Sequence, residues 1–262
     1  MADRGTAPST IVITGASSGL GAALAVAYAA PGVTLGLVAR NEARLAATRD
    51  ACRANGATVE VGVFDVADAA PLGDWLRGFD AQTPIDLVIA NAGVSAGPPP
   101  GAAAEGLALA TRQVQTNLLG TMNTIEPLLP ALAARRHGHV AVVASLAGYR
   151  GLAYSPAYSA SKAGVRAYGE ALRALLAPRG VAVSVVCPGF FSSPMTDRFI
   201  GAHPFRLSLD QATRIVKRGL DRGKRRIVFP WPLALGLRCA DLMPAALGDL
   251  IIRNVHFHIE PP

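Results

Sequence analysis

Short runs rich in apolar residues recur along the chain, and longer stretches with helical periodicity separate them. Each run spans four to six residues, which is the length of a strand that is buried on both faces of a sheet. The runs lie at residues 10–14, 33–38, 58–63, 85–90, 140–144, 181–186 and 226–229. They predict seven strands.

The stretches between the runs predict helices, bounded by recognisable start and stop signals. The predicted helices cover residues 20–30, 42–54, 107–135 and 157–177. Asn41 can cap the second helix and Gly56 can end it, while Pro178 stops the last. Ser208 and Gln211 fit a capping box that would start a further helix.

Alternation of strands with helices indicates a parallel sheet. The sequence therefore predicts an α/β fold: one doubly wound, Rossmann-like sheet of seven strands with helices on both faces. The chain has 262 residues, of which 51% are apolar and 16% charged, so it can bury one sizeable core and is not a disordered chain. Neither repeats nor linkers divide it, and a single domain over residues 1–262 is expected.

The three cysteines, Cys52, Cys187 and Cys239, are odd in number and widely spaced. They form neither a disulfide framework nor a metal-ligand pattern, so no metal is expected. The first ten residues contain no apolar segment of the kind found in signal peptides. The cytoplasm is the expected location.

The excess of basic residues is concentrated in one stretch. Residues 198–226 contain nine Lys or Arg and two Asp, a difference of +7 that equals the formal charge of the whole chain. A solvated helix face is the expected explanation, and nucleic acid is not an expected partner. A peripheral membrane contact through residues 198–252 stays open. The apolar tail, residues 230–252, could equally be short helices over the substrate pocket or a subunit contact.

A glycine-rich turn directly follows the first predicted strand. Its glycines, spaced G-x-x-x-G-x-G, allow a tight turn and the close approach of a pyrophosphate, and the helix that follows offers free amides to it. Placed between a strand and a helix, the turn predicts a dinucleotide site. The candidate residues are Gly15, Ser17, Ser18, Gly19, Leu20 and Gly21.

The end of the second strand bears on the choice of dinucleotide. An acidic residue there would bind the ribose 2′-hydroxyl of NAD, but the chain has Arg40 and Asn41 instead. Because Arg can pair a phosphate bidentately, NADP(H) is expected over NAD(H). Asp65 and Val66, after the third strand, could face the adenine.

Tyr158 and Lys162 are four residues apart on a predicted helix and share one face of it. A nearby cation favours the phenolate, so Lys162 is expected to lower the pKa of Tyr158 and fit it for proton transfer. Taken alone, this spacing is commonplace.

Several motifs together make the pattern specific. The turn from Gly15 to Gly21, Asn91-Ala92-Gly93, Ser145, and Tyr158 with Lys162 occur in order. In this combination the chain resembles the short-chain dehydrogenase/reductase family, from about residue 11 to residue 193. The resemblance implies that residues 8–193 form a cofactor-binding and catalytic core, and residues 194–262 a substrate loop and helical extension.

The resemblance also implies roles for matching residues. Ser145 would hold the substrate oxygen, Tyr158 would be the general acid/base, and Lys162 would bind the nicotinamide ribose and tune Tyr158. Asn117 would position a water for a proton relay. The cleft around the cofactor would include Asn91, Ala92, Gly93, Tyr158, Lys162, Pro188, Gly189, Phe191 and Ser193.

These roles predict an oxidoreductase that interconverts a carbonyl and an alcohol with NADP(H). A protein of the same fold that senses NADP(H) or binds a membrane surface without turnover is the alternative. The family resemblance further implies a homodimer or homotetramer.

Substrates should bind beyond the carboxyl ends of the strands, against residues 95–101, 146–154 and 190–204. An apolar pocket and a lipophilic substrate are expected, because these segments and their flank are rich in large apolar side chains. The candidates are Leu146, Tyr149, Leu152, Tyr154, Phe190, Phe191, Met195, Phe199 and Phe205.

Overall fold

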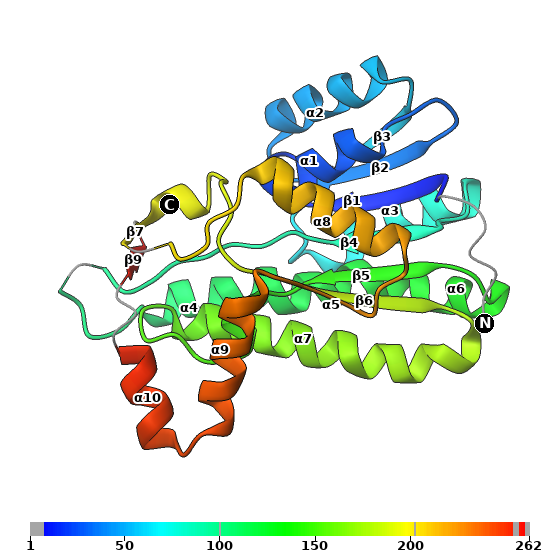
Figure 1. Ribbon diagram of the computed structural model, residues 1–262. Helices are drawn as coiled ribbons and strands as arrows, with labels where there is room; N and C mark the ends of the chain where they lie inside the picture. Colours follow the sequence, from blue (N-terminus) through cyan, green and yellow to red (C-terminus); the bar gives the residue numbers. More distant parts are fainter. Residues whose placement is uncertain (1–7, 100, 202, 254–256, 260–262) are drawn as a thin grey trace.

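A parallel sheet of seven strands forms the centre of the protein in this computed structural model, which describes residues 8–99, 101–201, 203–253 and 257–259. The strand order is β3-β2-β1-β4-β5-β6-β8 (Figure 1). The strands are β1 (Thr10–Thr14), β2 (Thr34–Ala39), β3 (Thr58–Val63), β4 (Leu87–Ala90), β5 (His139–Val143), β6 (Ala182–Pro188) and β8 (Arg226–Phe229). All lie where the sequence predicts strands, with ends shifted by two residues at most, and the predicted fold class is confirmed.

Helices cover both faces of this sheet. On one face lie α1 (Gly19–Tyr28), α2 (Glu42–Ala54) and α8 (Leu209–Asp221), and α3 to α7 pack on the other (Figure 1). The second group comprises α3 (Ala69–Gln82), α4 (Leu107–Val114), α5 (Gly120–Ile125), α6 (Leu129–Arg135) and α7 (Pro156–Leu176). Asn41 caps α2 and Ser208 with Gln211 forms the capping box of α8, as the sequence predicts.

In the inner strands of the sheet, alternate residues pack into two separate cores. Ile11 and Ile13 pack toward α1, α2 and α8, whereas Val12 between them packs toward α3 and α7. Because successive strand side chains point to opposite faces, a strand covered on both sides must be apolar throughout. This requirement explains the apolar runs of the sequence.

The single helix predicted over residues 107–135 is wrong in detail. The segment breaks into α4, a π-helical turn at Gln115–Leu119, α5, a 3-10 turn at Glu126–Leu128, and α6. Pro127 and Pro130 lack the amide hydrogen that a continuous helix would need at their positions. The π-helical turn contains Asn117, and such turns often accompany functional positions.

Helix α3 forms although the sequence signals for it are weak. Pro71, Gly73 and Gly78 lower its local helix propensity. Leu72, Leu76 and Phe79 are nevertheless buried in one core, on one face of the helix. Tertiary packing therefore decides this element.

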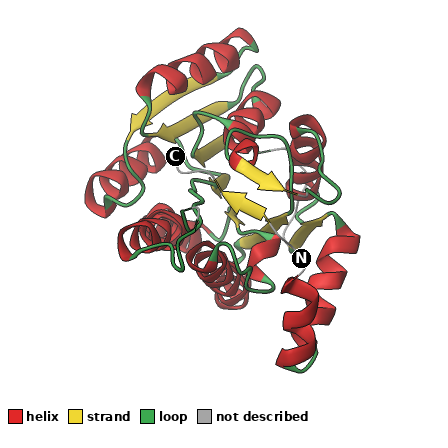
Figure 2. Ribbon diagram, turned by 90° about the vertical axis from the view of Figure 1, so that its left-hand side faces the viewer, coloured by secondary structure: helices red, strands yellow, loops and turns green. Residues whose placement is uncertain are grey.

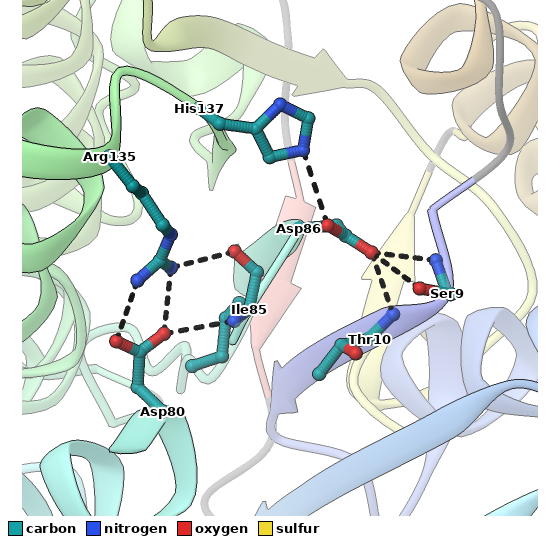
Figure 3. A network of polar contacts seen from close by, with 7 residues as sticks. All are labelled: Ser9, Thr10, Asp80, Ile85, Asp86, Arg135 and His137. Carbon is teal, nitrogen blue, oxygen red and sulfur yellow. Dashed lines mark hydrogen bonds and ion pairs between the residues drawn. The ribbon is translucent and has the colours of Figure 1, made fainter. Parts of the chain in front are cut away.

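A network of polar contacts joins residues at the amino-terminal ends of the neighbouring strands β1 and β4 to α3 and α6 (Figure 3). Asp80 accepts two hydrogen bonds from Arg135, at 2.7 and 2.8 Å, and one from the backbone amide of Ile85. Next to it, Asp86 accepts hydrogen bonds from Ser9 and from the amide of Thr10. Burial opposes ionisation of Asp86, but these hydrogen bonds outweigh it and lower its pKa.

The tail forms a helical hairpin, α9 (Trp231–Leu242) and α10 (Ala245–Arg253), which projects from the body near the carboxyl ends of the strands (Figure 1). Beyond it, β9 (Phe257–Ile259) pairs antiparallel with β7 (Phe199–Gly201), and this short ribbon lies in front of the main sheet in Figure 2. None of the helices in the described ranges has the length and apolar character needed to cross a membrane.

The basic stretch is partly neutralised within the fold. Arg214 pairs with Asp210 and Lys217 with Asp221 along the exposed side of α8, and Arg226 pairs with Glu170. This arrangement agrees with a solvated helix face.

Candidate active site

A cavity of about 680 Å³ opens along the carboxyl ends of the strands. It brings together nearly all of the predicted cofactor and catalytic residues. Those that line it are Gly15, Ser17, Ser18, Gly19, Leu20, Arg40, Asn41, Asp65, Val66, Asn91, Ala92, Gly93, Ser145, Tyr158, Lys162, Pro188, Gly189, Phe191 and Ser193. Gly21 and Asn117 do not line the cavity, but each packs against or bonds to a residue that does: Gly21 against Gly15, and Asn117 to Val94.

The glycine-rich turn has the conformation that its sequence predicts. Gly15 adopts a positive φ of 68°, and a side chain there would come within 2.8 Å of Ala92 Cα. A Cβ at Gly21 would lie 2.3 Å from the Gly15 carbonyl oxygen, so this glycine is required by packing. Helix α1 starts at the turn, and the Ser18 side chain does not cap its amides. These amides are free to bind an anion.

Asn91 fastens this turn to the neighbouring strand. Its side-chain amide donates to the carbonyl oxygens of Thr14 and Gly15, at 3.0 and 3.4 Å. The Thr14 hydroxyl accepts in return from the backbone amides of Asn91 and Ala92. The two loops that would flank a dinucleotide are thus held at a fixed separation.

The far end of the cavity is basic, but it contains one carboxylate. Arg40 pairs with Asp65 at 3.0 Å, and the placement of Asp65 at the adenine stays a prediction. The Asn41 side chain is engaged with the amide of Arg44 as the cap of α2. Arg44 also lines the cavity, and sequence reasoning missed it. Its place one helical turn after Arg40 was the available signal. Two guanidinium groups here outnumber one carboxylate.

Ser145, Tyr158 and Lys162 meet at the middle of the cavity. Ser145 lies two residues after β5, at the start of the 3-10 turn Leu146–Gly148, and interacts with Tyr158 through a side-chain hydrogen bond. Lys162 Nζ donates to the carbonyl oxygen of Val143 at 2.9 Å and lies 5.9 Å from the centre of the Tyr158 ring. Gly93 faces Lys162 so closely that a Cβ would come within 3.3 Å of its Nζ.

Burial governs the protonation of this pair. It raises the pKa of Tyr158 above its ordinary value, and the hydrogen bond with Ser145 lowers it only in part. Burial also lowers the pKa of Lys162 to about 8. The expected lowering of the pKa of Tyr158 is therefore wrong, because removal of the phenolate from water outweighs the other influences. Tyr158 is protonated at neutral pH.

Asn117 is buried, and its side chain is fully engaged. Its carboxamide oxygen accepts from the amide of Val94 at 2.8 Å, and its nitrogen donates to the Val94 carbonyl and the Ser161 hydroxyl, both at 2.9 Å. The side chain joins the loop after β4 to α7, the helix of Tyr158. A role in a proton relay stays a prediction.

The substrate end of the cavity is mainly apolar. Of the predicted residues, Leu146, Leu152, Phe190, Phe191, Met195 and Phe199 line it. Tyr149 does not: it is buried between the guanidinium groups of Arg166 and Arg238. Tyr154 is also absent from the lining, and Phe205 is 58% exposed on the surface.

Helix α9 supplies two lining residues that sequence reasoning did not single out, Leu233 and Leu237. Their spacing of four residues indicates that they share one face of a helix, but the sequence does not show that this helix lies against the cavity. The tail was expected to cover the pocket, to form a subunit contact or to lie on a membrane. Helix α9 covers the pocket.

Comparisons with known proteins agree with this geometry. The profile of the short chain dehydrogenase family matches residues 9–201. An uncharacterized oxidoreductase of Myxococcus xanthus is 38% identical, with 94% of this chain and 97% of that protein aligned.

Two solved structures are similar over most of the fold. The short-chain dehydrogenase of Sphingobium yanoikuyae in complex with NADPH is 26% identical with a TM-score of 0.76, covering 92% of this chain and 91% of that one. The bulky-bulky ketone specific alcohol dehydrogenase of Comamonas testosteroni is 27% identical with a TM-score of 0.74, covering 86% of both chains. The chain belongs to the short-chain dehydrogenase family of oxidoreductases.

Proposed function

We propose that the protein is an NADP(H)-dependent oxidoreductase that interconverts a lipophilic ketone or aldehyde and the corresponding alcohol. The observation that carries this proposal is the convergence of Ser145, Tyr158 and Lys162 at the junction between a dinucleotide-sized groove and an apolar pocket.

The groove fits a nicotinamide dinucleotide. The uncapped amides of α1 and the glycines of the turn suit a pyrophosphate, and Gly93 leaves room beside Lys162. Lys162 would hold the nicotinamide ribose, and the segment from Pro188 to Ser193 would flank the nicotinamide ring. When bound, the cofactor supplies or accepts the hydride at the substrate carbon.

The residues of the chain handle the proton. In the reductive direction the substrate carbonyl oxygen would accept hydrogen bonds from the hydroxyls of Ser145 and Tyr158, and Tyr158 would donate its proton as charge develops there. In the oxidative direction the Tyr158 phenolate would take the proton back. Tyr158, whose pKa is raised by burial, is in its acid form at neutral pH, which is the form that carbonyl reduction requires.

The preference for NADP(H) rests on Arg40 and Arg44 at the end of β2. Two guanidinium groups favour a 2′-phosphate over a hydroxyl, and no carboxylate occupies the positions directly after that strand. The similar Sphingobium dehydrogenase, which was solved with NADPH, supports this assignment.

A lipophilic substrate is supported by the lining of the pocket, with Leu146, Phe190 and Phe199 among its side chains. The likeness to an alcohol dehydrogenase specific for bulky-bulky ketones points the same way. A panel of ketones and aldehydes of increasing bulk, followed by NADPH absorbance, would identify the preferred class.

Tyr158→Phe tests the mechanism. We expect turnover to fall by a factor of at least about 100, because the proton donor is lost. NADPH, measured by fluorescence titration, should still bind. A Tyr158→Phe variant that retains turnover would refute the proposed mechanism, and wild-type protein that binds NADPH but reduces no member of the panel would favour a cofactor-sensing role.

Arg40→Ala tests the cofactor preference. We expect the affinity for NADPH to fall by about ten-fold or more, the effect of losing one charge-assisted contact, with NADH affinity nearly unchanged. Asp65→Asn is the matched control: it removes the partner of Arg40 without removing the guanidinium, and should not weaken NADPH. Equal losses for both cofactors in Arg40→Ala would contradict the assignment.

A further inference from the structure

Helix α7, which carries Tyr158, begins without a local cap. Ser155 occupies the N-cap position, yet its side chain makes no capping hydrogen bond, and its buried Oγ has no partner among the described residues. Pro156 follows and has no amide hydrogen. The first free amide of the helix is that of Ala157, the residue before Tyr158.

A carboxylate from a distant loop takes this amide. Glu105, in the segment before α4, accepts a hydrogen bond from the Ala157 amide with Oε2 at 3.1 Å. The two residues are 52 positions apart. Glu105 is only 6% exposed, and no ion pair to it exists in the described part of the chain. A negative charge at a helix N-terminus is favoured by the free amides and by the helix dipole.

Gln113, on α4, fixes the loop after β4, while its own side-chain nitrogen and the second carboxylate oxygen of Glu105, Oε1, have no hydrogen-bond partner among the described residues. Gln113 is 1% exposed, and its side-chain oxygen accepts from the amide of Ala96 at 2.9 Å. Burial raises the pKa of Glu105, and the Ala157 amide and the Gln113 side chain lower it in part.

Asn117 repeats this connection four residues further along, where it bonds both Val94 and Ser161. Glu105, Gln113 and Asn117 form a buried polar seam between the loop after β4 and the first turns of α7. A buried carboxylate without a cation is costly, so its contact with α7 is a specific feature of this fold and not an incidental one.

We propose that Glu105 is a positioning residue for catalysis: by capping α7 from the loop before α4, it sets the place of Tyr158 relative to Ser145 and the groove. This inference rests on the proposed function. Glu105 does not line the cavity and would touch neither substrate nor cofactor. Its effect should therefore appear in kcat and not in binding.

Two substitutions at Glu105 distinguish the effect of side-chain length from the effect of side-chain charge. Glu105→Gln keeps the length of the side chain and an oxygen that can accept from Ala157, whereas Glu105→Asp keeps the charge but is one methylene too short. We expect kcat for ketone reduction to stay within about three-fold of wild type in Glu105→Gln. It should fall about ten- to hundred-fold in Glu105→Asp and Glu105→Ala, the usual cost of misplacing a catalytic group. NADPH affinity and KM should change by less than about two-fold.

Glu126→Ala is the matched control, because Glu126 also contacts α7, through the Tyr168 hydroxyl at 2.7 Å, but ten residues after Tyr158. It should leave kcat unchanged. If Glu105→Ala does not fold, the test rests on Glu105→Gln and Glu105→Asp, whose side chains have nearly the native volume. The inference then requires a higher kcat in Glu105→Gln than in Glu105→Asp. Glu105→Asp as active as Glu105→Gln, or NADPH affinity falling in parallel with kcat, would overturn the inference.

Tyr158→Phe in the same assays keeps the two proposals distinct. Full activity in Tyr158→Phe would sink the proposed function itself. Loss of activity in Tyr158→Phe together with wild-type kcat in Glu105→Asp would sink only the role of Glu105.

Discussion

Lys162 is a buried cation that the fold tolerates at a cost. It is 4% exposed, contacts the Val143 carbonyl, and has a pKa lowered by burial to about 8. In an unfolded chain the same ammonium would have its ordinary pKa of 10.5. Charging it inside the protein therefore opposes folding. The role proposed for Lys162, at the nicotinamide ribose and beside Tyr158, would account for a lysine at this position.

Lys162→Met should stabilise the protein measured without cofactor. At pH 7 the charged lysine costs roughly 3 kcal/mol by its pKa shift, partly offset by its hydrogen bond of about 1–3 kcal/mol. Between pH 8 and 10.5 the unfolded chain binds the extra proton, so wild-type stability rises with pH relative to the variant. Urea unfolding at pH 7 and pH 9.5 should show the difference between the two proteins shrinking. A difference that is constant across this range would contradict the burial argument.

Tyr158 shows where residue-level reasoning from sequence fails. Its partner Lys162 and their shared helix face were predictable from a spacing of four. The direction of the pKa shift was not, because it depends on how much of the phenol is withdrawn from water by segments far away in the chain. Asn41 and Asp65 are similar cases: their side chains were predictable as part of the groove, but not their engagement with Arg44 and Arg40.

Helix α9 contributes two different faces to the protein. Leu233 and Leu237 point into the substrate end of the cavity, while Leu235 is 54% exposed on the outside. The helix thereby turns the tail into part of the pocket wall, and the pocket is not complete within the segment that matches the family profile, residues 9–201.

Leu237→Ala should enlarge the pocket. We expect kcat/KM for a bulky apolar ketone to fall by roughly ten-fold, since lost contacts with a few methylene groups are worth about 1–3 kcal/mol. A small ketone and NADPH should be affected little. Leu235→Ala, on the outer face of the same helix, is the control and should behave as wild type. Equal changes in the two variants would assign α9 a purely structural role.

The elements that sequence predicted well are those with strong local signals. The inner strands of the sheet are nearly continuous apolar runs, the edge strand β3 alternates apolar with polar or small residues, and α2 carries both a cap and a terminating glycine. Helix α3 escaped prediction because its one proline and two glycines mask a buried stripe of Leu72, Leu76 and Phe79. The π-helical turn at Gln115–Leu119 was equally out of reach, since it depends on side-chain bonds to the loop after β4.

The two ends of the strands in the main sheet carry different groups of residues, one at the candidate site and one in a network that stabilises the fold. The cavity lies at the carboxyl ends of the strands, whereas the network of Asp80, Arg135 and Asp86 lies at their amino ends (Figure 3). Asp80 is 7% exposed and Arg135 24%, and the pair also secures the backbone of Ile85 at the entry to β4. This separation makes their effects separable by mutation.

Asp80→Ala should destabilise the whole molecule without altering the site. Removing one partner of a buried pair leaves the other uncompensated and costs about 3–5 kcal/mol, which corresponds to a fall in Tm of roughly 10 °C. Calorimetry should show this loss, with KM unchanged below the transition. Asp74→Ala breaks the exposed pair with Arg77 and should change Tm very little. Similar Tm values for the two variants would refute the importance of the buried network.

The amino-acid sequence by itself determined the seven strands of the main sheet, the glycine-rich turn, and the shared helix face of Tyr158 and Lys162, because each depends on residues close together in the chain. Only the tertiary structure decided what those residues meet. It paired Arg40 with Asp65, placed Leu237 over the pocket and brought Glu105 to the start of α7. These contacts join segments that are distant in sequence, and the burial that sets their energies exists only once the chain has folded.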